Sequence, residues 1–358
     1  MPVDELKRNT TRGGPVSIFC CRNALLAFML AALPANPAMA QEKITIGITN
    51  AATDAGFFIA DKKGYFRAEG IEVTTTPFAS AAGMIAPLGR AQLDVGGGTV
   101  AAGLYNAVEH GIQLRVVADK GSVTEKLEYS TLVIRRDLLD SGRYRTLSDL
   151  KGMTLAVASP GSGSESSLNE ALKKGGLKFG DVKTVYMGFP QMLLALINRG
   201  IDGCVTNEPT LTRALREGAA VRASKDVIYP GQQTAVVLYS EDFAQNRRPL
   251  AQKFLNAYIR AVRDYNDAIL DGRLAGPHAA EIISILTAST EIKDRETYAR
   301  MNAFAVDPDG GVNVGTMDND LKFFQQRGLV SKNMTVGQII DKSFADEAVR
   351  VLGVYGPK

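Results

Sequence analysis

Short runs rich in β-branched and apolar residues alternate with segments of helical spacing along the first third of the chain. Two of the helical segments end at Gly64 and Gly111, and the position just after a helix favours glycine. Alternation of strand and helix predicts a largely parallel sheet with helices on its faces. The predicted strands are residues 44–49, 71–78, 93–97, 114–119 and 130–136.

The same alternation then begins again. The further predicted strands are residues 154–159, 182–187 and 201–207, and the helices between them are residues 164–174 and 190–199. A weak internal echo relates the two halves, since LGRAQLDVGGG (88–98) and INRGIDGCVTN (197–207) each run from a helix end through Arg and Asp into an apolar strand. The chain is therefore predicted to be an α/β protein with two related lobes.

The stretch from Pro249 onward is mainly helical, with Phe254, Leu255, Tyr258 and Val262 on one face. We expect this face to pack on a lobe.

A strand at residues 234–240 precedes that stretch, so the chain is predicted to cross back to the first lobe near residues 229–233. Two crossovers make a hinge. We expect one lobe of residues 41–135 plus 234–358 and a second lobe of residues 136–233.

The first forty residues have the zones of a secretory signal. Four basic side chains come before an apolar run at residues 24–33, and an Ala-Met-Ala triplet ending at Ala40 follows it. A run of this length is about half of the roughly 20 residues that a membrane-spanning helix needs. Cys20 and Cys21 precede the run, which argues against a lipid anchor. We expect cleavage after Ala40 and a soluble protein in the periplasm.

Charge and cysteine content narrow the class of protein. The predicted signal holds four of the 41 basic and two of the 38 acidic residues, so the rest of the chain has a net charge near +1. This balance gives no reason to expect nucleic acid as a partner. Only Cys204 remains after the signal, so the predicted mature chain has no internal disulfide.

Ligands of open parallel α/β sheets lie beyond the carboxyl ends of the strands. Two loops there, GGGT (96–99) and SPGSGSES (159–166), are glycine-rich turns directly before a predicted helix. Their backbone N–H groups and the helix dipole suit a carboxylate, sulfonate or phosphate. Alternatively, the glycines only close turns and the hydroxyls only cap helices. Matching loops at residues 50–56 and 207–209 favour a cleft.

Some side chains near these loops have two interpretations. Lys120, at the end of the fourth strand, faces the expected cleft as a counter-charge for an anion or is a solvated lysine. Glu208 precedes Pro209 and either contacts ligand or braces its own loop. Phe57 and Phe189 are candidates to line the pocket, and Phe57 is alternatively a core residue. The candidate ligand-binding residues are Asn50, Thr53, Asp54, Gly98, Thr99, Lys120, Ser162, Gly163, Ser164, Glu165, Phe189, Asn207, Glu208 and Gln232.

The sequence shows no recognised catalytic pattern. His110 and His278 are not near Cys204 in any known motif, and we expect both on the surface. GSGSES lacks the third glycine of a dinucleotide fingerprint, and there is no GK[ST] phosphate loop. DPDGG (307–311) lacks the acidic spacing of a calcium loop and is predicted to be a turn. We expect no catalytic residues, no metal and no cofactor.

Four segments carry a resemblance to a known family: AGFFIADKKGYFRAEGIEVTTTPFAS, LDVGGGTVAAGLYNAVEHG, ASPGSGSESSLNEALKKGGL and MGFPQMLLALINRGIDGCVTNEPTLTRALREG. Over about residues 44–265 the chain strongly resembles the solute-binding proteins of ABC importers for nitrate, sulfonates, taurine and aromatic acids, a family that includes thiamine-pyrimidine precursor proteins. The resemblance implies the type II periplasmic binding protein fold. In that fold two doubly wound α/β lobes, with C-terminal helices, close on ligand around a two-strand hinge. The implied binding loops are residues 50–54, 97–99, 162–165 and 207–208.

One branch of that family is enzymatic and makes the thiamine pyrimidine with a cysteine cluster and a sacrificial histidine. Asp54 stands where that branch commonly has histidine, and the cysteine cluster is absent. The resemblance thus implies a monomeric carrier of a small anionic organic solute, a sulfonate or an aromatic or aliphatic carboxylate, with an ABC permease and its ATPase as partners. The alternatives are an exported or cytosolic enzyme of the thiamine-pyrimidine precursor synthase type, and a periplasmic sensor subunit.

Overall fold

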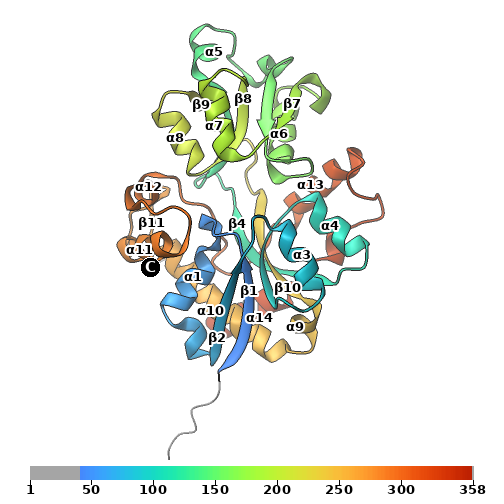
Figure 1. Cartoon of the computed structure of the whole chain (residues 1–358), viewed down its shortest axis with the longest axis vertical. Helices are drawn as coiled ribbons and strands as arrows, with labels where there is room; N and C mark the ends of the chain where they lie inside the picture. Colours follow the sequence, from blue (N-terminus) through green and yellow to red (C-terminus); the bar gives the residue numbers. More distant parts are fainter. Residues whose placement is uncertain (1–40, 357–358) are drawn as a thin grey trace, which may run out of the picture. The chain divides into compact units, whose positions relative to one another are not determined.

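The computed structural model describes residues 41–356 of the chain (Figure 1). The predicted export signal and the predicted cleavage after Ala40 lie outside the described residues. The described chain forms two five-stranded sheets and a short two-stranded one.

The first sheet has the strand order β2-β1-β3-β10-β4. Its strands are β1 (Glu42–Ile48), β2 (Ile71–Pro77), β3 (Val95–Thr99), β4 (Leu114–Ser122) and β10 (Gln233–Ser240). β1 pairs in parallel with β2 and β3, whereas β10 is antiparallel to both β3 and β4. Along β10, Val236 and Leu238 face one apolar cluster, and Val237 and Tyr239 face another. This strand is therefore covered on both faces.

Helices cover both faces of the first sheet (Figure 1). The helices from the first part of the chain are α1 (Ala55–Lys62), α2 (Tyr65–Ala68), α3 (Ala82–Gly89) and α4 (Ala102–Glu109). Those from its last third are α9 (Glu241–Gln245), α10 (Arg248–Asp267), α11 (Ala279–Ser289), α12 (Arg295–Arg300), α13 (Val314–Gln326) and α14 (Ser343–Leu352).

Helix α10 packs on the first lobe, as the sequence predicted. Phe254, Leu255, Tyr258 and Val262 are all buried in the cluster that also contains Phe57. The ring centroids of Phe57 and Tyr258 are 5.3 Å apart. Phe57 thus belongs to the core, which is one of the two alternatives that the sequence left open.

The second sheet has the order β7-β6-β8-β5-β9. Its strands are β5 (Ser130–Arg135), β6 (Thr154–Val157), β7 (Lys183–Tyr186), β8 (Gly203–Asn207) and β9 (Ala220–Arg222). Its helices are α5 (Arg136–Asp140), α6 (Gly163–Lys174), α7 (Phe189–Ile197) and α8 (Thr210–Arg216). Apolar clusters again lie on both faces, so each sheet has its own core.

The predicted strands all occur, with ends that shift by up to three residues, but one lies in the other sheet. The sequence placed residues 130–135 in the first lobe, and β5 instead pairs with β8 and β9 in the second sheet. It runs antiparallel to both, as β10 does in the first sheet. A strand that is buried on both faces has the same apolar pattern in either sheet and in either direction, so sequence pattern alone does not assign it.

Two connections join the sheets. Residues 123–129 lead from β4 to β5, and residues 223–232 lead from β9 to β10. The predicted return near residues 229–233 is confirmed, because β10 begins at Gln233 and joins the first sheet.

The remaining elements are short. A hairpin of β11 (Ile269–Leu270) and β12 (Arg273–Leu274) follows α10, and the predicted turn at residues 307–311 is present. The short 3₁₀ helices are Ala52–Asp54, Leu147–Leu150, Phe179–Asp181 and Val336–Gln338. Within residues 41–356, no helix has both the length and the apolar character to cross a membrane.

Candidate functional site

The loop after β1 is held by a buried ion pair. The Asp54 carboxylate accepts hydrogen bonds from the backbone N–H of Thr49 at 2.9 Å and of Ala51 at 3.2 Å. Its other oxygen lies 2.8 Å from Lys120 Nζ, which also donates to Thr53 Oγ1 at 3.1 Å. The side chains of Asp54 and Lys120 are 0% and 1% exposed. The two charges therefore compensate each other inside the first lobe.

This geometry corrects the expected position of Lys120. The sequence placed its ammonium group in the cleft, or else in solvent, and the structure buries it against Asp54 and Thr53. Asn50, in the same loop, is half-buried and adopts a left-handed backbone with φ of 55°. Its side chain remains a candidate for ligand contact.

The end of β3 has glycines because other groups come very close to its backbone. A Cβ on Gly97 would lie 2.7 Å from Asp54 Oδ1, and one on Gly98 would lie 2.5 Å from Leu238 Cδ1. Thr99 follows with an exposed side chain. Gly98 and Thr99 line a mainly apolar pocket of about 210 Å³ together with Ala81, Ile85, Ala101 and Leu104.

The predicted glycine-rich turn before α6 is an N-terminal cap. Ser162 Oγ accepts from the Glu165 N–H at 3.4 Å and donates to the Ser159 carbonyl at 2.7 Å. Ser164 Oγ accepts from the Ala158 N–H at 2.9 Å. The backbone N–H groups of Gly163 and Ser164, in the first turn, have no acceptor within residues 41–356. These two amides are available to an anion.

The buried side chains of Glu165 and Gln232 hydrogen-bond to the backbone of the turn before α6. Glu165 is fully buried and accepts from the Gly161 N–H at 2.8 Å, from Tyr186 Oη at 2.8 Å and from Arg327 Nη1 at 3.0 Å. Gln232 is 2% exposed. It accepts from Ser167 Oγ at 2.7 Å, and its Nε2 donates to the Gly163 carbonyl at 2.8 Å. Both side chains position α6, and their polar groups are already occupied.

Glu208 braces its own loop, one of the two alternatives left open by the sequence. Its carboxylate accepts from the Thr212 N–H at 2.9 Å and from Asn302 Nδ2 at 2.7 Å. It thereby joins α8 to the segment after α12. Burial raises the pKa of Glu208 above its usual value, and these hydrogen bonds partly offset that rise. Asn207 and Phe189 are half-buried, and Phe189 packs on the apolar cluster beneath α7.

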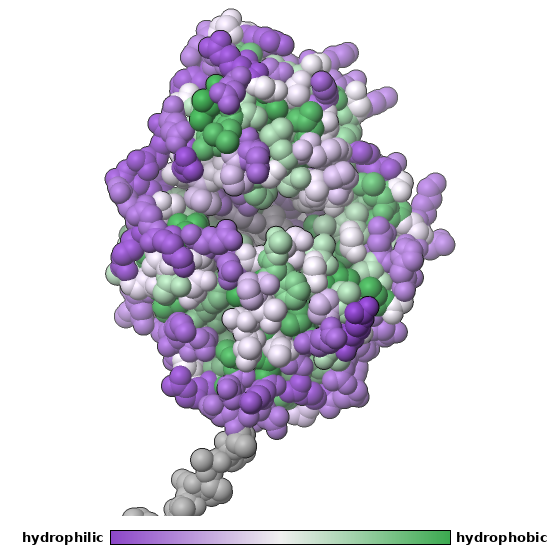
Figure 2. All heavy atoms as spheres, in the orientation of Figure 1, coloured by the Kyte–Doolittle hydropathy of each residue, from purple (hydrophilic) through white to green (hydrophobic). Residues whose placement is uncertain are grey.

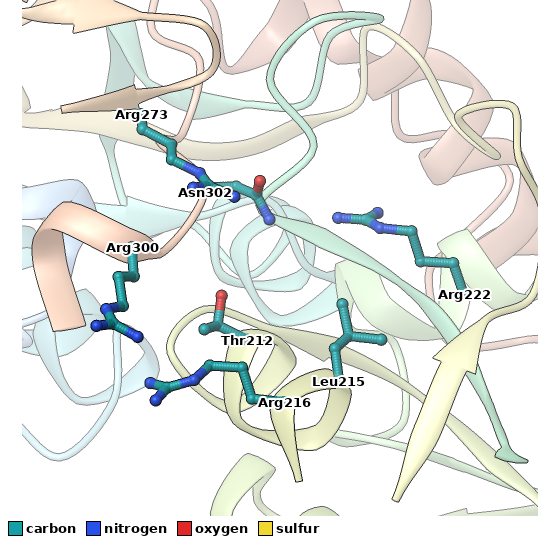
Figure 3. A pocket seen from close by; sticks show the side chains of 7 residues that line it. All are labelled: Thr212, Leu215, Arg216, Arg222, Arg273, Arg300 and Asn302. Carbon is teal, nitrogen blue, oxygen red and sulfur yellow. The ribbon is translucent and has the colours of Figure 1, made fainter. Parts of the chain in front are cut away.

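Sequence reasoning missed an arginine-lined pocket of about 450 Å³ (Figure 3). Its lining residues are Thr212, Leu215 and Arg216 from α8, Arg222 from β9, Arg273 from β12, Arg300 from the end of α12, and Asn302. A hollow between the lobes has a strongly hydrophilic left rim, where α8 and α12 lie (Figure 2). The four arginines come from four separate elements, and acidic residues elsewhere nearly balance the basic ones in the whole sequence. No local sequence pattern therefore predicts that these arginines lie together.

A polar network between α13 and the second lobe was also missed. Asp320 is fully buried, accepts from Tyr229 Oη at 2.7 Å and is bonded to Ser166 Oγ on α6. Burial raises the pKa of Asp320 to about 7. The only sequence signal was an acidic residue on the apolar face of a helix, which by itself identifies no partner.

The two histidines and the one cysteine of the described chain differ in burial. His110 and His278 are exposed, as predicted. Cys204, a residue of β8, is buried in the apolar core, and burial raises the pKa of its thiol to about 12. No cluster of three or more His, Cys, Asp or Glu side chains able to hold a metal occurs in the described part of the chain.

Solved structures with a similar fold include sulfonate-binding and nitrate-binding proteins. The periplasmic aliphatic sulphonate binding protein SsuA of Escherichia coli is 20% identical, with 84% of this chain and 92% of that one covered and a TM-score of 0.66. The alkanesulfonate-binding protein SsuA of Xanthomonas axonopodis pv. citri, bound to MOPS, is 18% identical, with 85% and 100% covered and a TM-score of 0.63. The periplasmic nitrate-binding protein NrtA of Synechocystis PCC 6803 is 14% identical, with 88% and 90% covered and a TM-score of 0.65.

These likenesses show that the two-lobed fold implied by the sequence resemblance is correct: it is the fold of periplasmic binding proteins. No protein with a curated description matches the sequence significantly. Residues 38–273, more than half of the chain, match one family over a segment that contains both crossovers and all the candidate loops. The chain belongs to the NMT1-like family.

Proposed function

We propose that this protein is the solute-binding component of an ABC-type importer and that it captures a small anionic organic solute, a sulfonate or a carboxylate, between its lobes. The family and the fold support a solute-binding role. The ligand class rests on the chemistry of the loops, which offer backbone amides and hydroxyls as donors.

One observation carries the proposal: donor loops from both lobes lie side by side. The Ala102 N–H, at the start of α4, donates to the Gly161 carbonyl at 2.8 Å. A Cβ on Gly163 would lie 3.8 Å from the Val100 carbonyl oxygen. Thr99 and the available amides of Gly163 and Ser164 are therefore near neighbours. An anion held there would contact both lobes and so favour the state in which they are close.

The N-terminal sequence supports a proposal about the compartment in which the protein works. We infer that residues 1–40 direct export and that the mature chain, starting at Gln41, works in the periplasm as a monomer. A permease with its ATPase would then recognise the ligand-bound form.

A thermal-shift screen of residues 41–358 tests the ligand class. Sulfonates, aromatic and aliphatic carboxylates, and pyrimidines would be added singly. A compound present at about 100 times its Kd stabilises the protein by roughly 2.7 kcal/mol, so a carrier ligand should raise the Tm clearly. Failure of every compound to raise the Tm, together with turnover of any of them, would contradict the carrier role.

A pair of variants tests the position of the site. Thr99→Val removes the exposed hydroxyl at the end of β3 and should weaken binding of an anionic hit about tenfold, the scale of one hydrogen bond to a charged group. Thr74→Val is the matched control, because Thr74 is an exposed residue of β2 in the same sheet, outside the candidate loops. Equal affinities of the two variants, measured by calorimetry, would remove Thr99 from the site.

A further inference from the structure

The arginine-lined pocket is formed by elements of both lobes. Arg216 on α8 and Arg222 on β9 belong to the second sheet's layer, whereas Arg273 on β12 and Arg300 on α12 come from the chain that follows α10. The pocket holds about 450 Å³, the size of a small-molecule site. Figure 3 shows the guanidinium groups of Arg216 and Arg300 turned toward each other, that of Arg273 beside Asn302, and that of Arg222 pointing in from the opposite side.

Two of these arginines have no internal counter-charge. Arg222 pairs with Glu128, and Arg300 pairs with Glu296 one turn earlier on its helix. Arg216 and Arg273 are exposed, and their side chains have no hydrogen-bond or ion-pair partner within residues 41–356. No acidic residue lines the pocket. The space is therefore electropositive, and an anion within it would relieve repulsion between like charges.

The buried carboxylate of Glu208 is bonded to two residues of the pocket wall. All four hydrogen bonds to the Glu208 carboxylate come from the pocket residues Thr212 and Asn302. Glu208 therefore orients two neutral donors along the wall, and within residues 41–356 it forms no ion pair with an arginine. It also ties the two sides of the pocket together, because Thr212 is on α8 and Asn302 follows α12.

We propose that this pocket is a second binding site, distinct from the loops around Thr99 and Ser162, and that it takes a small polyanion with at least two negatively charged groups. A guanidinium group donates two parallel hydrogen bonds to a carboxylate or phosphate, so several arginines around one space suit such a ligand. An inorganic polyphosphate and an organic tricarboxylate share this chemistry. Because the arginines come from both lobes, the bound polyanion bridges them and stabilises the state in which they are close.

Calorimetry on residues 41–358 at low ionic strength tests the site, with pyrophosphate and citrate as separate probes. Wild type should bind at least one of them, and binding should weaken with added salt. The double variant Arg216→Gln/Arg273→Gln removes the two unpaired charges and should weaken that binding by about tenfold or more. Arg213→Gln is the matched control, because Arg213 is also on α8 but pairs with Glu217 outside the pocket. It should bind like wild type.

The outcomes separate this site from the carrier site. Absence of binding to wild type, or equal affinity of the double variant and Arg213→Gln, would overturn the proposal. Thr99→Val should leave the affinity for the probe unchanged. A loss in Thr99→Val as large as in the double variant would place the polyanion at the loops instead, and would overturn the second site while leaving the proposed carrier function intact. Selective binding of citrate or of pyrophosphate identifies which of the two groups the arginines prefer.

Discussion

The ion pair between Lys120 and Asp54 changes the role assigned to Lys120, from a ligand contact to a structural contact. Two opposite charges buried within 2.8 Å compensate each other, and the same contact ties the loop after β1 to β4. Removing one partner of a buried pair leaves an uncompensated charge, which costs much more than the pair itself contributes. The principal effect of Lys120 is thus on the stability of the first lobe.

We predict that Lys120→Met lowers the free energy of unfolding by about 3–5 kcal/mol, because the buried Asp54 carboxylate loses its counter-charge and keeps only the hydrogen bonds of its own loop. Urea unfolding of residues 41–358 measures it. Lys62→Met is the control, since its pair with Asp61 is exposed (56% and 42%) and such pairs contribute about 1 kcal/mol or less. Asp54→Asn/Lys120→Met should recover part of the loss. A Lys120→Met chain as stable as the Lys62→Met chain would contradict the buried pair.

At the scale of elements, α13 joins the second lobe through α6 and the second crossover. Asp320 contacts Ser166 on α6 and Tyr229 in the crossover, and Asn319 donates to Glu170 on α6 at 3.0 Å. Burial is the main cause of the raised pKa of Asp320; the bonds from Ser166 and Tyr229 lower it in part, and the charge of Glu170 raises it further. This contact between elements depends on the protonation state of one carboxyl.

The sign of the pH dependence follows from this raised pKa. The folded-state pKa is about 7 and the unfolded value is 3.8, so the folded chain binds the proton more tightly. The stabilising contribution is complete below pH 3.8, decreases as the pH rises through this interval and is lost above about pH 7. The slope is at most about 1.4 kcal/mol per pH unit.

We predict that Asp320→Asn shows a smaller fall in unfolding free energy between pH 4 and pH 7 than wild type does. Urea unfolding at pH 4, 5.5, 7 and 8 measures the difference. Asp318→Asn on the same helix is the control, because Asp318 is exposed and paired with Lys322. Asp119, whose pKa burial raises to about 6, remains in both variants and keeps part of the slope. Parallel curves for wild type and Asp320→Asn would contradict this prediction.

At the scale of the whole molecule, two connections, a few polar contacts and the packing of Phe179 on Phe323 join the two sheets and their cores. Each sheet has apolar clusters on both faces, and residues 123–129 and 223–232 are the chain connections between them. Interfaces of this kind permit relative motion of the parts, since the cores need not change.

We predict that saturating ligand lowers the radius of gyration of residues 41–358 in small-angle scattering. A compact chain of this length has a radius of gyration of about 20 Å, and closure should bring the protein toward that value. Thr99→Val at the same ligand concentration should show less of the change, because less ligand is bound. An unchanged radius in wild type at saturation would contradict ligand-driven closure.

Local pattern was enough to locate the elements and the loops. Apolar runs marked the strands, and Gly64 and Gly111 marked helix ends where the structure has left-handed φ values of 77° and 88°. The loop before the helix predicted at residues 164–174 contains Ser162, which caps α6. Each of these features depends on neighbours within a few residues, so sequence pattern determines it. The resemblance carried by the glycine-rich loops also indicated the family before any contact was known.

Only the tertiary structure decided what depends on residues far apart in the chain. It assigned β5 to the second sheet, paired Lys120 with Asp54 across 66 residues, joined Asp320 to Ser166 across 154, and brought together arginines from four separate elements. The physical reason is that burial and charge compensation depend on which side chains are close together in the folded protein. These side chains come from distant parts of the sequence, so local pattern does not reveal them. The sequence predicted two lobes and the loops between their strands and helices, and the fold determined which charged side chains lie unpaired.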